Sequence, residues 1–150
     1  MSYSGTPFSS AQFARVDAVA DPETAAHIRR EFSEWLRRCV TLDPTKSSDV
    51  VLAVNEAMAN AAEFAYVERP GPMHVRADYD GTAATLTVTV TDEGAWRKVD
   101  HATKRHSRGR GIPLMQALAD RATVESSPAG TQVCLEWNQV TAQNCGSRTT

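Results

Sequence analysis

The sequence predicts an α+β domain, a two-layer α/β sandwich in which helices pack on one face of a mixed, mostly antiparallel sheet. Two pairs of strand-like segments are joined by short turns, at Asp80-Gly81 and at residues 126–130, and short turns join antiparallel neighbours. A parallel doubly wound sheet would need a helix between most strands. The predicted order is instead strand, helix, helix, strand, strand, glycine-rich loop, helix, strand, strand.

The length and composition describe an ordinary globular domain. The chain has 150 residues and a formal net charge of −2, so one domain is expected and the global charge does not indicate nucleic-acid binding. No apolar run approaches the roughly 20 residues of a membrane helix, and the start lacks the pattern of a secretion signal. The three cysteines lack metal-ligand spacing and are typical of reduced thiols.

These observations predict a cytoplasmic protein with no direct contact to nucleic acid and none to a membrane. We expect the domain to span residues 12–138. A flexible N-terminus at residues 1–11 would precede it, and a polar C-terminal tail at residues 139–150 would follow it.

The first strand and the first helix have clear local signals. Residues 12–19 alternate apolar and polar side chains, which favours a strand. Asp21-Pro22-Glu23-Thr24 then combines an acidic N-cap, proline at the first helical position and a further acid in the first turn. The helix is predicted to run to about Val40, and its apolar side comprises Ala26, Ile28, Phe32, Trp35, Leu36 and Cys39.

A second helix is predicted over Val50–Tyr66, after a connector at residues 42–48 and a cap at Ser48 or Asp49. Its apolar stripe recurs at spacings of three and four, through Val50, Val54, Ala57, Ala61 and Ala65. Glu56 and Asn60 are one turn apart and project from one side of this helix. On this stretch alone, two such polar residues are also typical of a solvated helix face.

The remaining elements follow a turn at residues 67–72. Two alternating runs at residues 73–79 and 84–90 predict a hairpin, and Asp92-Glu93-Gly94 ends the second run. Residues 95–108 form a basic stretch without apolar periodicity. A helix is expected over residues 112–121, and two closing strands over residues 122–125 and 131–137.

Two short motifs in these segments suit a nucleotide. A carboxylate such as Asp92 at a strand end can accept a hydrogen bond from an exocyclic amine, and Gly94 lets a planar ligand approach the backbone. Gly109-Arg110-Gly111 before a helix offers free N–H groups to phosphate, and Arg108 and Arg110 add positive charge. Each motif alone is equally typical of an ordinary turn.

These two motifs follow the Glu56/Asn60 pair, and Gly130-Thr131 comes next, before the final strand. The four motifs in this order resemble the ATP-binding fold shared by gyrase, Hsp90, histidine kinases and MutL, known as the GHKL or Bergerat fold. Glu56 and Asn60 resemble its N box, and the glycine motifs resemble its two glycine boxes. Within that group, the sequence resembles bacterial anti-sigma-factor serine kinases of the RsbW and SpoIIAB type. The similar phrases are AVNEAMANAAEFAY, TVTDEGAW, RGRGIPLMQALADRATVES and AGTQVCLEW, and the resemblance covers about residues 12–138.

This resemblance implies ATP and Mg²⁺ as cofactors and a role for each matching residue. Asn60 would coordinate Mg²⁺, and Glu56 would be the general base. Asp92 would bind the adenine amine, with Gly94 beneath the base and Thr131 supporting Asp92 or a water. The lid over the phosphates would contain Arg108, Gly109, Arg110 and Gly111.

The resemblance also implies a function in bacterial transcription regulation. The chain would be a serine/threonine protein kinase that phosphorylates a small STAS-type anti-anti-sigma partner and regulates a sigma factor. Related kinases dimerise, so a homodimer is one expected state. The alternative is a nucleotide-gated binding module without phosphotransfer, because Phe64 replaces a histidine that is usual in the family and residues 95–98 lack its proline. A histidine-kinase catalytic domain is the least favoured alternative.

Overall fold

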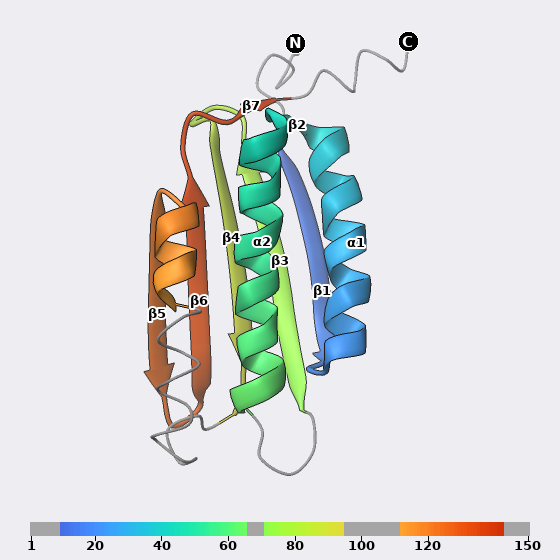
Figure 1. Cartoon of the computed structure of the whole chain (residues 1–150), viewed down its shortest axis with the longest axis vertical. Helices are drawn as coiled ribbons and strands as arrows, with labels where there is room; N and C mark the ends of the chain where they lie inside the picture. The colour runs from blue at the N-terminus through green and yellow to red at the C-terminus, as the bar shows by residue number, and fades with distance from the viewer. Residues whose placement is uncertain (1–9, 66–70, 95–111, 143–150) are drawn as a thin grey trace, which may run out of the picture.

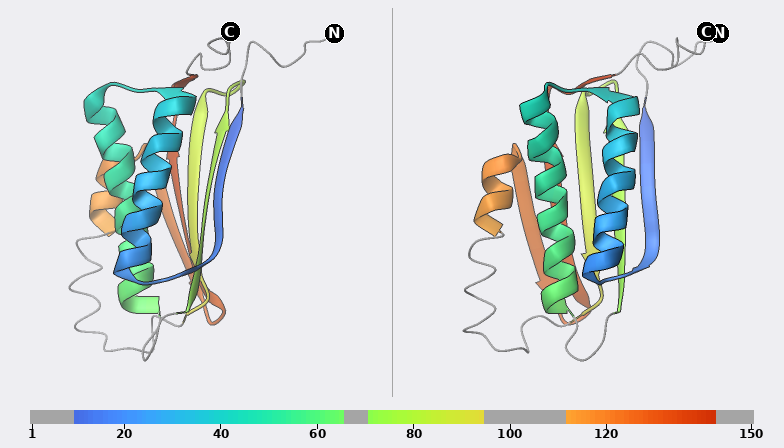
Figure 2. Two further views of the ribbon diagram at one scale, coloured as in Figure 1. Left: turned by 90° about the vertical axis from the view of Figure 1, so that its right-hand side faces the viewer. Right: turned by 45° about the vertical axis from the view of Figure 1, so that its right-hand side comes forward.

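The structure is a computed structural model of the chain, and it describes residues 10–65, 71–94 and 112–142. It has two layers, with the helices on one face of a five-stranded sheet and the opposite face of the sheet open (Figure 1, Figure 2). The predicted α+β class and two-layer architecture are confirmed. Among the described residues, no helix is long and apolar enough to cross a membrane.

The main sheet has the strand order β1-β3-β4-β6-β5, and every pair of neighbours in it is antiparallel. The predicted hairpins are confirmed, and the prediction that some pairs are parallel is not met among these strands. The strands are β1 (Ala11–Val19), β3 (Pro72–Asp80), β4 (Thr85–Asp92), β5 (Arg121–Ser127) and β6 (Gly130–Trp137).

The first helix, α1 (Pro22–Cys39), begins where the sequence predicts. The Asp21 side chain accepts a hydrogen bond from the Thr24 backbone N–H at 2.7 Å, which satisfies one of the free donors of the first turn. The third predicted helix, expected over residues 112–121, is shorter than predicted. Residues 112–118 are helical, and β5 already begins at Arg121.

The second helix, α2 (Pro44–Asn60), differs from the prediction at both ends. It begins at Pro44, where the Asp43 side chain accepts from the Lys46 N–H at 2.8 Å, so neither Ser48 nor Asp49 caps it. Its α-helical hydrogen bonding ends at Asn60 and continues as a π-helical segment, η1 (Ala61–Ala65). The predicted helix at residues 50–66 is therefore two helical forms joined next to Asn60.

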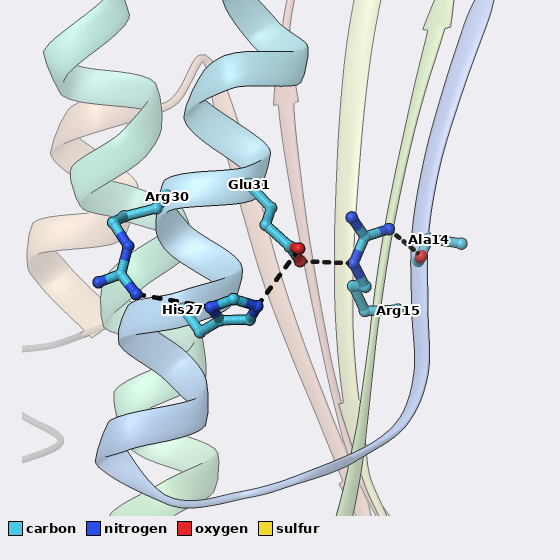
Figure 3. A network of polar contacts seen from close by, with 5 residues as sticks. All are labelled: Ala14, Arg15, His27, Arg30 and Glu31. Atoms are coloured by element: carbon cyan, nitrogen blue, oxygen red, sulfur yellow. Dashed lines mark hydrogen bonds and ion pairs between the residues drawn. The ribbon is translucent and has the colours of Figure 1, made fainter.

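The core lies between the helices and the inner face of the sheet. In one part of it, Phe32 of α1 packs edge-on against Phe13 of β1, with ring centroids 5.6 Å apart, and stacks on Trp35. At the edge, the Arg15 Nε of β1 donates to the Glu31 carboxylate of α1 at 2.7 Å (Figure 3). This hydrogen bond holds the pKa of Glu31 below its ordinary value.

The folded part extends past the predicted start of the C-terminal tail at residue 139. β7 (Thr141–Ala142) pairs with β2 (Val40–Thr41), which follows α1. Val140 is buried, and its carbonyl accepts a 2.6 Å hydrogen bond from the Tyr79 hydroxyl. Burial raises the pKa of Tyr79, so this hydroxyl keeps the proton that it donates.

Candidate nucleotide site

The predicted site residues of the described chain gather at one end of the sandwich. Helix α2 lies across the inner face of the sheet and contacts β4 and β6, and η1 also contacts β4. The C-terminal end of α2 thus lies over the sheet end where β4 finishes and β6 begins (Figure 1). The fold therefore brings the predicted N-box helix to the strands that carry Asp92 and Thr131.

Asn60 is the last α-helical residue of α2, and it is buried with 4% of its surface exposed. Among the described residues its Nδ2 atom has no hydrogen-bond partner. A buried amide donor without a partner costs about 1–3 kcal/mol of desolvation. The solvated-face alternative is wrong for Asn60, and its position suits a ligand that supplies the missing acceptor.

Glu56 lies one helical turn before Asn60 and is half-buried. Buried small residues, Ala53 and Ala57, flank it along α2. These short side chains let the helix approach the sheet closely. The carboxylate of Glu56 is therefore held near the end of α2 on a regular helical turn, one turn from the point where η1 begins.

The sheet beneath this end of α2 changes from apolar to polar within one row of paired residues. Directly paired residues of antiparallel strands point to the same face. The inward row closer to the middle of the sheet is entirely valine: Val75, Val90, Val133 and Val124. Two residues further along each strand, the same face carries Met73, Asp92, Thr131 and Ser126.

Asp92 and Thr131 are buried in this last row, with exposures of 4% and 3%. The Asp92 Oδ1 accepts the Gly94 backbone N–H at 3.0 Å, which orients the carboxylate and the start of the loop together. The hydroxyl oxygens of Thr131 and Ser126 are 3.1 Å apart. Ser126 itself is exposed, so the row runs from two buried polar side chains to an accessible hydroxyl. Such a carboxylate and two hydroxyls can form hydrogen bonds with the donors and acceptors of a polar heterocycle.

Gly130 is required by close backbone packing at the start of β6. It has a φ of 149°, and a Cβ atom placed there would lie 2.0 Å from the Asp92 carbonyl oxygen. No side chain fits that space without moving β4 or β6. Gly130 therefore fixes the distance between the strand end that carries Asp92 and the strand start that carries Thr131.

A cleft of about 460 Å³ opens at this end of the sheet, between the loop after β4 and the β5–β6 hairpin. Its walls include Asp92, Gly130 and Thr131, and Ser126 of β5 adds a hydroxyl. Asn60 is outside this lining, which also includes Thr91, Glu93, Glu125 and Gln132 from the open face of the sheet. The cleft therefore lies at the sheet end beside Asp92 and Thr131, and no described residue of α2 lines it. Its size is within the range of small-molecule sites.

The structure locates five of the predicted site residues: Glu56, Asn60, Asp92, Gly94 and Thr131. Arg108, Gly109, Arg110 and Gly111, the predicted lid residues, lie outside the described residues. Ser126 was missed by sequence reasoning because its place beside Thr131 depends on the register of the β5–β6 hairpin. Gly130 did have a local signal, since a glycine before the final strand belonged to the motif pattern.

Two comparisons with known proteins identify the family and the fold. The model of the histidine kinase-like ATPase domain family matches residues 18–137. The fold is similar to the crystal structure of the RsbU and RsbW domains of Rv1364c from Mycobacterium tuberculosis, with a TM-score of 0.69 and 22% identity. That match covers 87% of this chain and 33% of the other, so this chain spans about a third of its length. The chain belongs to the histidine kinase-like ATPase domain family and is a kinase-like ATP-binding module.

Proposed function

We propose that this protein is a serine/threonine protein kinase of the anti-sigma-factor type. Its substrate would be a serine or threonine of a small STAS-type anti-anti-sigma protein, and its second partner a sigma factor. The observation that carries the proposal is the pair on α2: a half-buried Glu56 carboxylate one turn before a buried Asn60 amide whose Nδ2 has no partner among the described residues. A plain nucleotide-binding module has no need for that carboxylate.

The residues fit ATP and Mg²⁺. Asn60 would hold Mg²⁺ through its amide oxygen, which is a hard ligand of the kind that this ion takes, while its free N–H donates to a phosphate oxygen. Asp92 would accept from the adenine amine, and Gly94 would lie beneath the base. Mg²⁺, when bound, would neutralise charge that develops on the phosphates. Arg108, Gly109, Arg110 and Gly111 would add donors to the same phosphates.

In the transfer step, Glu56 would act as the general base. Its carboxylate takes the proton of the substrate hydroxyl while that oxygen forms a bond to the γ-phosphorus, and the bond to the β–γ bridging oxygen breaks to release ADP. Phosphoryl transfer depends mainly on positioning and electrostatic stabilisation. A base one helical turn from the residue that holds the metal can orient the attacking hydroxyl.

The partner assignment has separate support. The sequence phrases that resemble anti-sigma-factor kinases run through the whole folded part of the chain, and the fold is similar to a structure that contains an RsbW domain. A cytoplasmic location and action without direct nucleic-acid or membrane contact belong to the same proposal. A homodimer would be the expected assembly.

The experiment is transfer of labelled phosphate from ATP to candidate STAS-type proteins. We expect transfer by the wild type, and a loss of about 100-fold or more for Glu56→Gln, as is usual for removal of a general base. Glu63→Gln is the matched control, because Glu63 is an exposed carboxylate just beyond α2. Unchanged transfer by Glu56→Gln contradicts the assigned base. ATP binding without transfer to any cognate partner would favour the nucleotide-gated binding module.

A further inference from the structure

The segment Asp92-Glu93-Gly94, where β4 ends, is also held by a contact on the open face of the sheet. Residues alternate between faces along a strand, so Thr91 and Glu93 point away from the helices while Asp92 points toward them. On that open face the Glu93 carboxylate lies 3.1 Å from the Nε2 of His74, which belongs to the neighbouring strand β3. His74 is directly paired with Thr91, so it reaches Glu93 diagonally across the ladder.

The other ring nitrogen of His74 has its own partner on β1. The ladder between β1 and β3 skips Val16 and Asp17, and Asp17 takes a left-handed φ of 58° at this bulge. The Asp17 backbone N–H, which has no partner in the β1–β3 ladder, donates to the His74 Nδ1 at 3.1 Å. One imidazole therefore joins the bulge of the edge strand to the loop after β4.

These contacts give the two ring nitrogens different partners. A backbone N–H can only donate, so Nδ1 is the acceptor of the Asp17 N–H, and Nε2 is the nitrogen that faces the Glu93 carboxylate. The Asp17 carboxylate also lies near Nδ1, with its Oδ1 3.8 Å away, so the ring lies between two acidic side chains. His74 has only 26% of its side chain exposed, which limits the number of orientations that the ring can take.

We propose that His74 is a positioning residue for the segment Asp92-Glu93-Gly94, an inference that rests on the proposed function of the site. Glu93 stands between Asp92, which would bind adenine, and Gly94, whose N–H is held by Asp92. His74 holds this segment from the open face while Gly130 packs against its backbone from β6. Loss of the His74 contact lets the segment move, and the carboxylate of Asp92 is then less well ordered for the adenine amine.

The test is calorimetric binding of ATP with Mg²⁺, and of ADP, to variants at His74, Arg76 and Glu93. Loss of one hydrogen bond to a charged group predicts about fivefold weaker binding of both nucleotides by His74→Ala. Arg76→Ala is the matched control, because Arg76 lies two residues along β3 on the same face and is exposed. We expect its affinity to equal that of the wild type.

Two conservative variants separate the two contacts of the ring. His74→Gln keeps an N–H near the position of Nε2 and retains the Glu93 contact, so it should bind ATP within about twofold of the wild type. His74→Asn keeps an acceptor near the position of Nδ1 and retains only the Asp17 contact, so it should bind as weakly as His74→Ala. If Asn restores binding and Gln does not, the role of His74 is to hold the β1 bulge, and the proposal is overturned.

Glu93→Ala provides a second route, because it removes the carboxylate that faces Nε2 and leaves the histidine in place. It should weaken ATP binding in the same direction, and it should add nothing in the His74→Ala background, because both changes break one interaction. Additive losses contradict the proposal. Wild-type protein that binds no ATP would overturn the proposed function together with this inference, whereas equal ATP affinity of wild type and His74→Ala overturns only the inference.

Discussion

The two long helices lie side by side on the same face of the sheet and have different tasks (Figure 2). Both begin with an aspartate cap followed by proline. The buried residues of α1 are all apolar, whereas α2 also buries the amide of Asn60. Helix α1 ends in a regular cap, and α2 passes into the π-helical η1. Single turns of π-helix occur frequently at functional sites. We therefore infer that α1 mainly supports the core, whereas the change from α- to π-helix after Asn60 belongs to the site.

Truncation of the α1 core should produce the largest loss of stability. Phe32 is fully buried against Phe13 and Trp35, and Phe32→Ala is expected to lower the free energy of unfolding by about 3–5 kcal/mol. Urea denaturation measures this, and Phe32→Leu should lose less because it leaves a smaller cavity. A loss below about 1 kcal/mol would show that α1 does not support the core as described.

The corresponding change in α2 should separate stability from binding. Asn60→Leu removes a buried amide with an unpaired donor, so the free energy of unfolding should stay the same or rise by about 1 kcal/mol. ATP·Mg²⁺ affinity should fall more than about tenfold, which calorimetry detects.

Asn55→Leu is the control on the same helix. Asn55 accepts a 3.4 Å contact from Arg29 of α1 and lies away from the site, so its ATP affinity should not change. A large destabilisation by Asn60→Leu would mean that the amide serves the fold and not a ligand.

The N-terminal cap of α2 should have a moderate effect on stability and little effect on the site. Asp43→Ala removes the acceptor of the Lys46 N–H and should cost about 1 kcal/mol of unfolding free energy. Asp43→Asn, which keeps a capping oxygen, should recover most of it. ATP affinity should be the same in both variants, because the cap is more than four helical turns from Asn60.

The smallest effect concerns the half-exposed ion pair between Arg15 of β1 and Glu31 of α1 (Figure 3). The Arg15 hydrogen bond lowers the pKa of Glu31 from its ordinary value of 4.5. Its stabilisation is therefore complete above pH 4.5 and is lost as the pH falls through the lower pKa of the folded state. In urea titrations from pH 7 to pH 3, the stability of wild type should approach that of Glu31→Gln in acid. Glu34→Gln, an exposed carboxylate on the same helix, should show no such convergence.

Local signals predicted α1 almost to the residue, because Asp21-Pro22 and an apolar stripe coincide there. The same cap signature occurs at Asp43-Pro44, but the largely exposed first turn of α2 has no apolar periodicity, so the sequence pattern predicts a connector there. The cap chemistry alone was sufficient to begin this helix. The hairpin from β3 to β4 was predictable because strand alternation and a turn dipeptide agree.

The sequence by itself determined the fold class and the order of the main strands and helices, because cap, turn and periodicity signals act over a few residues. Its motifs also predicted the five site residues that the structure describes. Only the tertiary structure decided that Asn60 is buried with an unpaired amide, that Ser126 joins Thr131, and that His74 reaches Glu93. Each of these depends on strand register or on the change from α to π geometry. Those features result from packing between segments distant in the chain, and no local pattern specifies them.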